Sequence, residues 1–220
     1  MSDRHIEVAR LNMIEQQIRP WEVLDPRVLD LFKQIPREVF VPEKYRKLAF
    51  ADVEIPIGHG QSMMKPILEG RLLQALSLEA SDSVLEIGTG SGFVTACLAR
   101  LGASVTSVEI FEDLKFAAVH RLRDLGVDNV RLRVGDAAGG WEAERTFDAI
   151  AITGSMPSIP DAYRNQLRPG GRLFVVTGKH PAMRAWLVTR VGDTQWSEEC
   201  LFETDLARLE NVADAPEFVF

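Results

Sequence analysis

The chain contains few cysteines and no pattern of residues typical of a metal site. Among its 220 residues there are 2 cysteines, Cys97 and Cys200, and neither belongs to a CxxC pair. This wide spacing argues against a disulfide framework and against a zinc site, so we expect no bound metal. Cys97 falls inside an apolar helical segment, and we interpret it as a small core residue.

Excess positive charge and long apolar runs are also missing. With 25 Lys and Arg against 32 Asp and Glu, the formal net charge is -7. Nucleic-acid binding that is independent of base sequence requires a basic face, so we expect no nucleic-acid partner. The first residues lack the apolar segment of a leader peptide, and no apolar stretch is long enough to span a bilayer. We therefore expect a cytoplasmic protein with no membrane partner.

The composition that is present is ordinary for a globular protein. Hydrophobic residues make up 46% of the chain and charged residues 26%, which is sufficient for a substantial core. At this length one domain is the default. We predict a single domain over residues 1–220, with a helical extension at 1–78 and an α/β core at 79–220.

Short apolar runs alternate with helical segments in the second part of the chain. The expected strands lie near 83–87, 104–109, 130–134, 147–152 and 171–177, and the expected helices lie near 92–101, 112–125 and 158–167. This alternation predicts parallel strands buried on both faces and joined by right-handed crossovers. Two further runs, Ala185–Val191 and Cys200–Leu206, are plausible antiparallel additions at the sheet edge. The fold class is therefore α/β, with a doubly wound, mostly parallel sheet of seven strands and helices on both faces.

The N-terminal part reads as helical and irregular structure. Helices are expected near 6–17 and 26–35, the second with Asp25 as its N-cap, and another begins at Pro66.

The most informative segment runs from Val84 to Gly92 and reads VLEIGTGSG. A dinucleotide-binding turn requires Gly or Ala as the sixth residue of its glycine motif, whereas here that residue is Phe93. The Gly-Lys-Ser/Thr ending of a phosphate-binding P-loop is missing too. Glu86, two residues before the first glycine, would repel a pyrophosphate but attract a ligand that carries an ammonium and a sulfonium. The turn therefore suggests S-adenosylmethionine as the cofactor.

Two further acids follow predicted strands. Glu109 ends the second strand, where a carboxylate can accept hydrogen bonds from ribose hydroxyls. Asp136 follows the third strand and could accept a hydrogen bond from an adenine amino group. Alternatives remain open, because Glu109 could be a solvated strand end and Asp136 a turn residue beside Gly135. The small residues at 153–157 suit either the mouth of a substrate site or a plain surface connection.

Several segments together resemble the protein-L-isoaspartate O-methyltransferase family, within the class I S-adenosylmethionine-dependent methyltransferases. They read PREVFVP at 36–42, AFAD at 49–52, IPIG at 55–58, GQ at 60–61 and LRPGGRL at 167–173. The likeness extends from about Met13 to Val176. It implies a Rossmann-like methyltransferase sheet, and transfer of a methyl group to the carboxylate of isoaspartyl residues as a step of protein repair.

The resemblance also implies site residues and partners. The partners would be proteins or peptides that contain isoaspartyl residues, while the oligomeric state, monomer or homodimer, stays open. The cofactor-binding residues would be Gln61, Ser62, Met63, Met64, Glu69, Glu86, Gly88, Thr89, Gly90, Gly92, Glu109, Ile110, Asp136 and Ala137.

The chain departs from the family at one catalytic position. Met64 stands where the family keeps its active-site serine, so a hydrogen-bond donor is lost. Ser62, His59 or Lys65 could supply a replacement donor. Three interpretations stay open: Met63 and Met64 pack on the cofactor, the acceptor differs, or the chain is a catalytically weak binding module. The apolar end at 216–220 is expected to add an edge strand or to cap the substrate groove.

Overall fold

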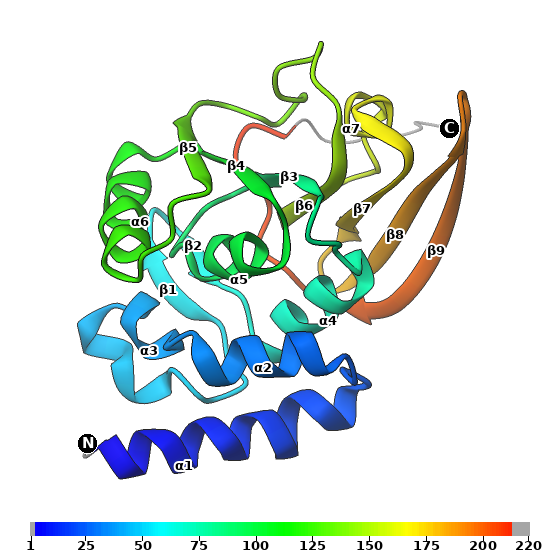
Figure 1. Ribbon diagram of the computed structural model, residues 1–220. Helices are drawn as coiled ribbons and strands as arrows, with labels where there is room; N and C mark the ends of the chain where they lie inside the picture. The colour runs from blue at the N-terminus through cyan, green and yellow to red at the C-terminus, as the bar shows by residue number, and fades with distance from the viewer. Residues whose placement is uncertain (1–2, 213–220) are drawn as a thin grey trace.

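The structure of the protein is a computed structural model that describes residues 3–212 (Figure 1). Its N-terminal part contains short helices and a two-stranded hairpin. These elements are α1 (Asp3–Met13), η1 (Ile14–Ile18), η2 (Arg19–Trp21), α2 (Pro26–Gln34), α3 (Arg37–Phe40), η3 (Glu43–Leu48), β1 (Ile55–Gly58), β2 (Gln61–Met63) and α4 (Pro66–Leu76). Figure 1 shows α1 and α2 as a layer along one side of the molecule.

The remaining elements build a seven-stranded sheet. They are β3 (Ser83–Ile87), α5 (Phe93–Leu101), β4 (Ser104–Glu109), α6 (Glu112–Asp124), β5 (Val130–Val134), β6 (Phe147–Met156), α7 (Asp161–Asn165), β7 (Leu167–Lys179), β8 (Ala182–Gly192) and β9 (Gln195–Thr204). The strand order is β5-β4-β3-β6-β7-β8-β9. The first five strands in this order are parallel, and β8 and β9 are antiparallel additions. The predicted doubly wound α/β fold with an N-terminal helical extension is confirmed.

Local signals in the sequence account for several element boundaries. Asp25 caps α2 as predicted, since its carboxylate accepts a hydrogen bond from the backbone N–H of Arg27. Pro26 occupies the first helical position, where no backbone donor is needed. Cys97 is fully buried in α5, which confirms that it is a core residue.

The two faces of the sheet pack into separate apolar clusters. Val84 contributes to the cluster shared with α5 and the N-terminal helices, whereas Leu85 and Ile87 contribute to the cluster on the other face. Successive side chains of a strand point to opposite faces. Glu86 therefore lies on the same face as Val84, beneath α5, and its hydrogen bond to Thr95 of that helix agrees with this.

Three sequence-based boundaries were wrong. The helix expected at 158–167 is limited to α7, because β7 already begins at Leu167, which pairs with Phe147 of β6. The second edge strand is β9 rather than 200–206, because its hairpin turn follows Gly192 directly. The loop expected at 153–157 is largely part of β6, which continues to Met156. The tail at 216–220 lies outside the described residues.

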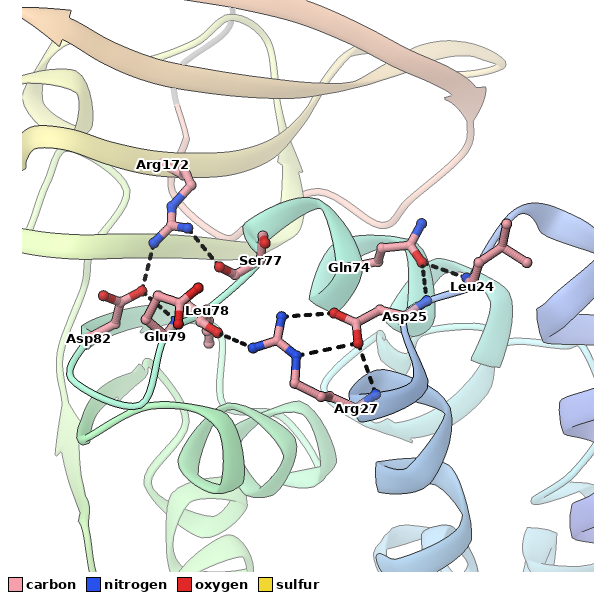
Figure 2. A network of polar contacts seen from close by, with 9 residues as sticks. All are labelled: Leu24, Asp25, Arg27, Gln74, Ser77, Leu78, Glu79, Asp82 and Arg172. Atoms are coloured by element: carbon pink, nitrogen blue, oxygen red, sulfur yellow. Dashed lines mark hydrogen bonds and ion pairs between the residues drawn. The ribbon is translucent and has the colours of Figure 1, made fainter.

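A network of polar contacts joins the N-terminal helices to the sheet (Figure 2). Arg27 of α2 binds the Asp25 carboxylate and the carbonyl of Leu78, which follows α4. Arg172 of β7 binds the Asp82 carboxylate at 2.6 Å and the carbonyl of Ser77. Since Asp82 immediately precedes β3, this network lies at the amino ends of the parallel strands. It ties the start of α2 and the end of α4 to this end of the sheet, opposite to the carboxyl ends.

No helix within residues 3–212 is both long and apolar enough to cross a membrane.

Candidate functional site

An open cleft lies at the carboxyl ends of the parallel strands, where the strand order reverses between β3 and β6. Open α/β sheets bind ligands at this point. The cleft holds about 810 Å³ of empty space, a volume that includes space open to solvent. The predicted site residues that line it are Gln61, Ser62, Met63, Met64, Glu69, Gly88, Thr89, Gly90, Glu109, Ile110, Asp136 and Ala137.

The glycine turn forms one wall and is held by backbone contacts. The Gly88 N–H donates to the Val108 carbonyl at 2.8 Å. Gly88 has a φ of +95°, and a Cβ atom there would overlap the Thr153 hydroxyl oxygen. That hydroxyl donates to the carbonyls of Ile87 and Gly88. The turn therefore requires glycine both for its conformation and for its close packing.

Glu109 fixes the turn from the end of β4. Its carboxylate accepts hydrogen bonds from the N–H of Gly90 at 2.7 Å and of Phe111 at 3.1 Å. The residue is 5% exposed and lines the cleft. Because each carboxylate oxygen accepts more than one hydrogen bond, Glu109 can still bind ligand hydroxyls.

Asp136 lies across the cleft, after β5. Its two oxygens accept hydrogen bonds from the Ala138 N–H and the Asn211 side chain, both at 2.9 Å. The hydroxyl of buried Tyr163 donates to the Ala137 carbonyl. Burial raises the pKa of Tyr163, so this donor keeps its proton. These contacts fix Asp136 and Ala137 before any ligand arrives.

The segment from Gln61 to Met64 covers the cleft on the side of the N-terminal extension. The Met64 side chain is 4% exposed, and its backbone carbonyl accepts a hydrogen bond from Arg37 at 2.7 Å. Arg37 is fully buried and also makes a two-point ion pair with Glu69, at 2.9 and 3.1 Å. Burial raises the pKa of Glu69, although the Arg37 charge opposes the shift. Arg37 thus holds two parts of the cleft wall from behind.

Glu86 is not among the residues that line the cleft. Its side chain is fully buried beneath α5, and its Oε2 accepts hydrogen bonds from Thr95 and Ser107, both at 2.5 Å. The sequence interpretation placed this carboxylate against the ligand. Strand alternation turns it instead toward the helix, behind the glycine turn.

His59 and Gly92 also lie outside the cleft lining. The His59 ring stacks on Phe111 with centroids 4.0 Å apart, and its Nε2 is 2.9 Å from the Asp113 carboxylate. Gly92 is the N-cap of α5, with a φ of +89°. In residues 3–212 no cluster of three His, Cys, Asp or Glu side chains is placed to hold a metal.

The sequence interpretation missed a further wall of the cleft. Residues 206–211, here called the C-terminal strap, pair with Ser155 through three hydrogen bonds and bring Leu209 and Glu210 to the cleft. Glu210 accepts a hydrogen bond from the Gln61 side chain at 2.8 Å, and Asn211 binds Asp136 on the opposite wall. The strap thereby links both walls. No local pattern in the strap sequence indicates these contacts, because their partners are distant in the chain.

Comparisons with known proteins agree on one family. Residues 9–204 match the sequence model of the family described as Protein-L-isoaspartate(D-aspartate) O-methyltransferase (PCMT). The chain is 36% identical over 199 residues to the protein-L-isoaspartate O-methyltransferase of Brucella anthropi, covering 90% of this chain and 91% of the relative. It is 39% identical over 197 residues to protein-L-isoaspartate O-methyltransferase 2 of Pelobacter propionicus, covering 89% and 88%.

Solved structures show the same fold. One, named protein-L-isoaspartate O-methyltransferase, superposes with a TM-score of 0.79 at 24% identity and covers 93% of this chain and 67% of its own. A Plasmodium falciparum protein in complex with S-adenosyl-L-homocysteine superposes with a TM-score of 0.76 at 19% identity. The match covers 90% of this chain and 97% of the Plasmodium chain. The structural likeness supports the fold, while the sequence matches determine the family. The chain belongs to the protein-L-isoaspartate(D-aspartate) O-methyltransferase family.

Proposed function

We propose that this chain transfers a methyl group from S-adenosylmethionine to the carboxylate of isoaspartyl residues in damaged proteins. The observation that carries the proposal is the family match over residues 9–204. The cleft supports it, because most of the residues that the resemblance implies for the cofactor surround this one space.

The residues of the cleft fit the cofactor. Gly88 and Gly90 give a wall without side chains, and both have positive φ values. We propose that Glu109 accepts hydrogen bonds from the ribose hydroxyls and that Asp136 accepts one from the adenine amino group. Met63 and Met64 add apolar surface to the cleft wall.

The reaction requires little acid–base chemistry from the protein. The cofactor supplies a methyl group on a sulfonium, which is a good leaving group. A substrate carboxylate is already ionised at neutral pH. One of its oxygens forms a bond to the methyl carbon while the carbon–sulfur bond breaks, and the electron pair of that bond remains on sulfur. The chain then has to orient the carboxylate in line and exclude water.

The neighbourhood of the cleft suits an acceptor that is part of a polypeptide. A second cavity adjoins it: Gly154 lines the cleft, whereas the next residue, Ser155, lines the cavity. Its wall includes Glu54, Lys179, His180, Asp205 and Arg208. A polypeptide whose carboxylate reaches the cleft could pass over these polar groups. This arrangement supports a protein acceptor rather than a small carboxylic acid.

Methyl transfer to a defined peptide tests the proposal directly. The protein is incubated with labelled S-adenosylmethionine and an isoaspartyl peptide, and the matched aspartyl peptide serves as the control. We expect base-labile label on the isoaspartyl peptide alone. Equal labelling of both peptides, or of neither, would contradict the proposed acceptor.

A second candidate function keeps the cofactor and changes the acceptor. It is favoured by Met64, which is buried in the cleft wall and offers no strong hydrogen-bond donor. Ser62 also lines the cleft and is a candidate replacement donor. His59 is already engaged with Asp113 and is less suited to this role.

The variant Met64→Ser separates the two candidates. Restoring a hydroxyl that contributes about 1 to 3 kcal/mol would raise isoaspartyl methylation roughly ten- to a hundred-fold. Initial rates with the isoaspartyl peptide measure the gain, and Met63→Ser is the positional control. If the parent is inactive and the variant active, the natural acceptor is not isoaspartate. If neither methylates any carboxylate while both bind the cofactor, the binding-module interpretation is favoured.

Other expectations remain predictions. They are the division at residues 78 and 79, a cytoplasmic location, and the lack of nucleic-acid and membrane partners.

A further inference from the structure

A chain of hydroxyl groups connects buried Glu86 to the cleft. The Ser107 hydroxyl donates to Glu86 Oε2 at 2.5 Å, and its oxygen lies 2.6 Å from the Thr89 hydroxyl. Thr89 lines the cleft, whereas Ser107 and Glu86 do not. Since Ser107 has a single hydroxyl hydrogen, donating it to Glu86 requires that Thr89 donate to Ser107. We call Thr89, Ser107 and Glu86 the hydroxyl relay.

The direction of this relay depends on the charge of Glu86. When Glu86 is ionised, Thr89 donates inward and presents only lone pairs to the cleft. When Oε2 carries a proton, Glu86 can donate to Ser107 and Ser107 to Thr89, which leaves the Thr89 hydrogen free to point into the cleft. The ionised form therefore favours a cationic ligand in the cleft, both through its charge and through the lone pairs of Thr89.

No cation contacts Glu86 in the part of the chain that the structure describes. The polar groups that face it are Thr95 from α5 and Ser107 from β4, and its Oε1 is buried with no hydrogen-bond partner among the described residues. The nearby titratable groups are the Glu109 carboxylate and the Cys97 thiol, whose own pKa is raised by burial. Arg37 pairs with Glu69 and does not contact Glu86.

The protonation energetics agree with this geometry. Burial raises the pKa of Glu86 to about 8, the Ser107 and Thr95 hydrogen bonds oppose the shift, and the Glu109 charge adds to it. In the empty cleft at neutral pH, Glu86 is therefore mostly protonated. A positive charge placed beyond Thr89 would lower this pKa, because opposite charges favour the ionised form.

We propose that Glu86 is a positioning residue that couples cofactor charge to a proton. It is neutral when the cleft is empty. When the sulfonium cofactor binds, Glu86 passes its proton to Ser107, Ser107 passes its own to Thr89, and the Thr89 proton leaves to water, so that each hydroxyl keeps one hydrogen. This inference rests on the cofactor of the proposed function but not on the acceptor. S-Adenosylhomocysteine, the product, lacks the sulfonium charge. Glu86 thus makes the cleft favour the reactive cofactor over the product, and more strongly as the pH rises through about 8.

Calorimetric titration with each ligand tests the coupling without turnover. S-Adenosylmethionine and S-adenosylhomocysteine are titrated at pH 8 in buffers of different ionisation enthalpy, so that the slope gives the protons exchanged. We expect release of several tenths of a proton with S-adenosylmethionine and almost none with S-adenosylhomocysteine. If the sulfonium lowers the pKa of Glu86 by one unit, from about 8, the affinity ratio of the two ligands increases about sevenfold between pH 6.5 and 9.

Variants identify the group that releases the proton. Glu86→Gln should abolish the release and flatten the pH dependence of the affinity ratio. Ser107→Ala keeps the buried carboxylate but removes a hydrogen bond that lowers the pKa of Glu86. The pKa should then rise further, so proton release at pH 8 should fall while the fold persists. Glu112 is an exposed acid at the start of α6, and Glu112→Gln is the control. This variant should release protons as the parent does.

Three outcomes would overturn the inference: equal proton release with both ligands, unchanged release in Glu86→Gln, or no binding of S-adenosylmethionine. Should Glu86→Gln fail to fold, the parent titrations together with Ser107→Ala still decide. Loss of isoaspartyl methylation with intact proton release would refute the proposed acceptor alone.

Discussion

Arg37 shows how a single buried charge shapes the cleft from outside it. Its guanidinium binds Glu69 and the backbone carbonyls of Ala49 and Met64, and lies 5.6 Å from the Phe93 ring centroid. Because Glu69 and Met64 line the cleft, Arg37 joins the N-terminal extension to the proposed active site. Met64 can thus change its side chain without losing the backbone contact that holds it.

Replacing Arg37 should be far more damaging than replacing the whole ion pair. Arg37→Met would leave Glu69 charged and buried without a partner, and we expect a loss of about 3 to 5 kcal/mol in the free energy of unfolding. The double variant Arg37→Met/Glu69→Met removes both charges and should recover much of the lost stability. Urea denaturation at pH 7 measures the free energy of unfolding of both variants. An equal loss in the two variants would contradict this account of the pair.

The C-terminal strap depends on a small residue beneath it. A Cβ atom at Gly154 would lie 2.8 Å from two side-chain atoms of Leu209, although the Gly154 backbone itself is compatible with alanine. Gly154→Ala should therefore displace the strap at a cost of about 1 to 3 kcal/mol. We expect faster proteolysis at the strap and weaker S-adenosylhomocysteine binding.

A matched glycine controls this experiment. Gly139 also lies in a backbone conformation open to alanine, and a Cβ atom there would meet nothing within 4 Å. Gly139→Ala should leave proteolysis and ligand affinity unchanged. Calorimetry and timed digestion of both variants compare the two positions. Parent-like behaviour of Gly154→Ala would show that the strap does not shape the cleft.

The elements that the sequence predicted well are those with a local signal. The strands β3, β4, β6 and β7 were readable because burial on both faces makes them largely apolar runs, whereas the edge strand β5 was readable from the alternation of apolar and arginine residues in VRLRV. The glycine turn and Glu109 were found because their positions relative to a strand end are fixed. The strap was missed because its contacts join distant residues. The orientation of Glu86 was missed because a motif does not show which face of a strand a helix will cover.

The two ends of the parallel strands have separate roles. The cleft occupies the carboxyl ends of the strands, whereas the network around Arg27 and Arg172 occupies the amino ends (Figure 2). A change in this network should therefore lower stability without changing ligand affinity.

Arg172→Met tests this separation. The side chain is 20% exposed and pairs with Asp82, so we expect a loss of about 1.5 to 3 kcal/mol in the free energy of unfolding. Arg168→Met, which breaks the more exposed pair with Asp148, should lose at most about 1 kcal/mol. Affinity for S-adenosylhomocysteine should stay within twofold in both. A tenfold change of this affinity in Arg172→Met would show that the two ends of the strands are coupled.

The stability of the whole molecule should also depend on pH through Glu86. Its pKa in the folded chain is about 8, above the ordinary value of 4.5, so the folded state holds this proton more tightly than the unfolded state. The stabilisation of the folded state that comes from this proton is therefore complete below pH 4.5, and it is lost as the pH rises to about 8. We compare the free energy of unfolding of Glu86→Gln with that of the parent. The difference should favour the variant more at pH 9 than at pH 5. Denaturant titrations at both pH values measure the difference, and a constant difference would contradict the assignment.

The hydrogen bond between Gln61 and Glu210 joins residues 149 positions apart. Closing so long a loop is slow, because chain entropy is lost before distant contacts form. During refolding the sheet can therefore assemble before both walls of the cleft are connected. We expect cofactor affinity to develop later than the sheet does, which would make ligand binding a reporter of complete folding.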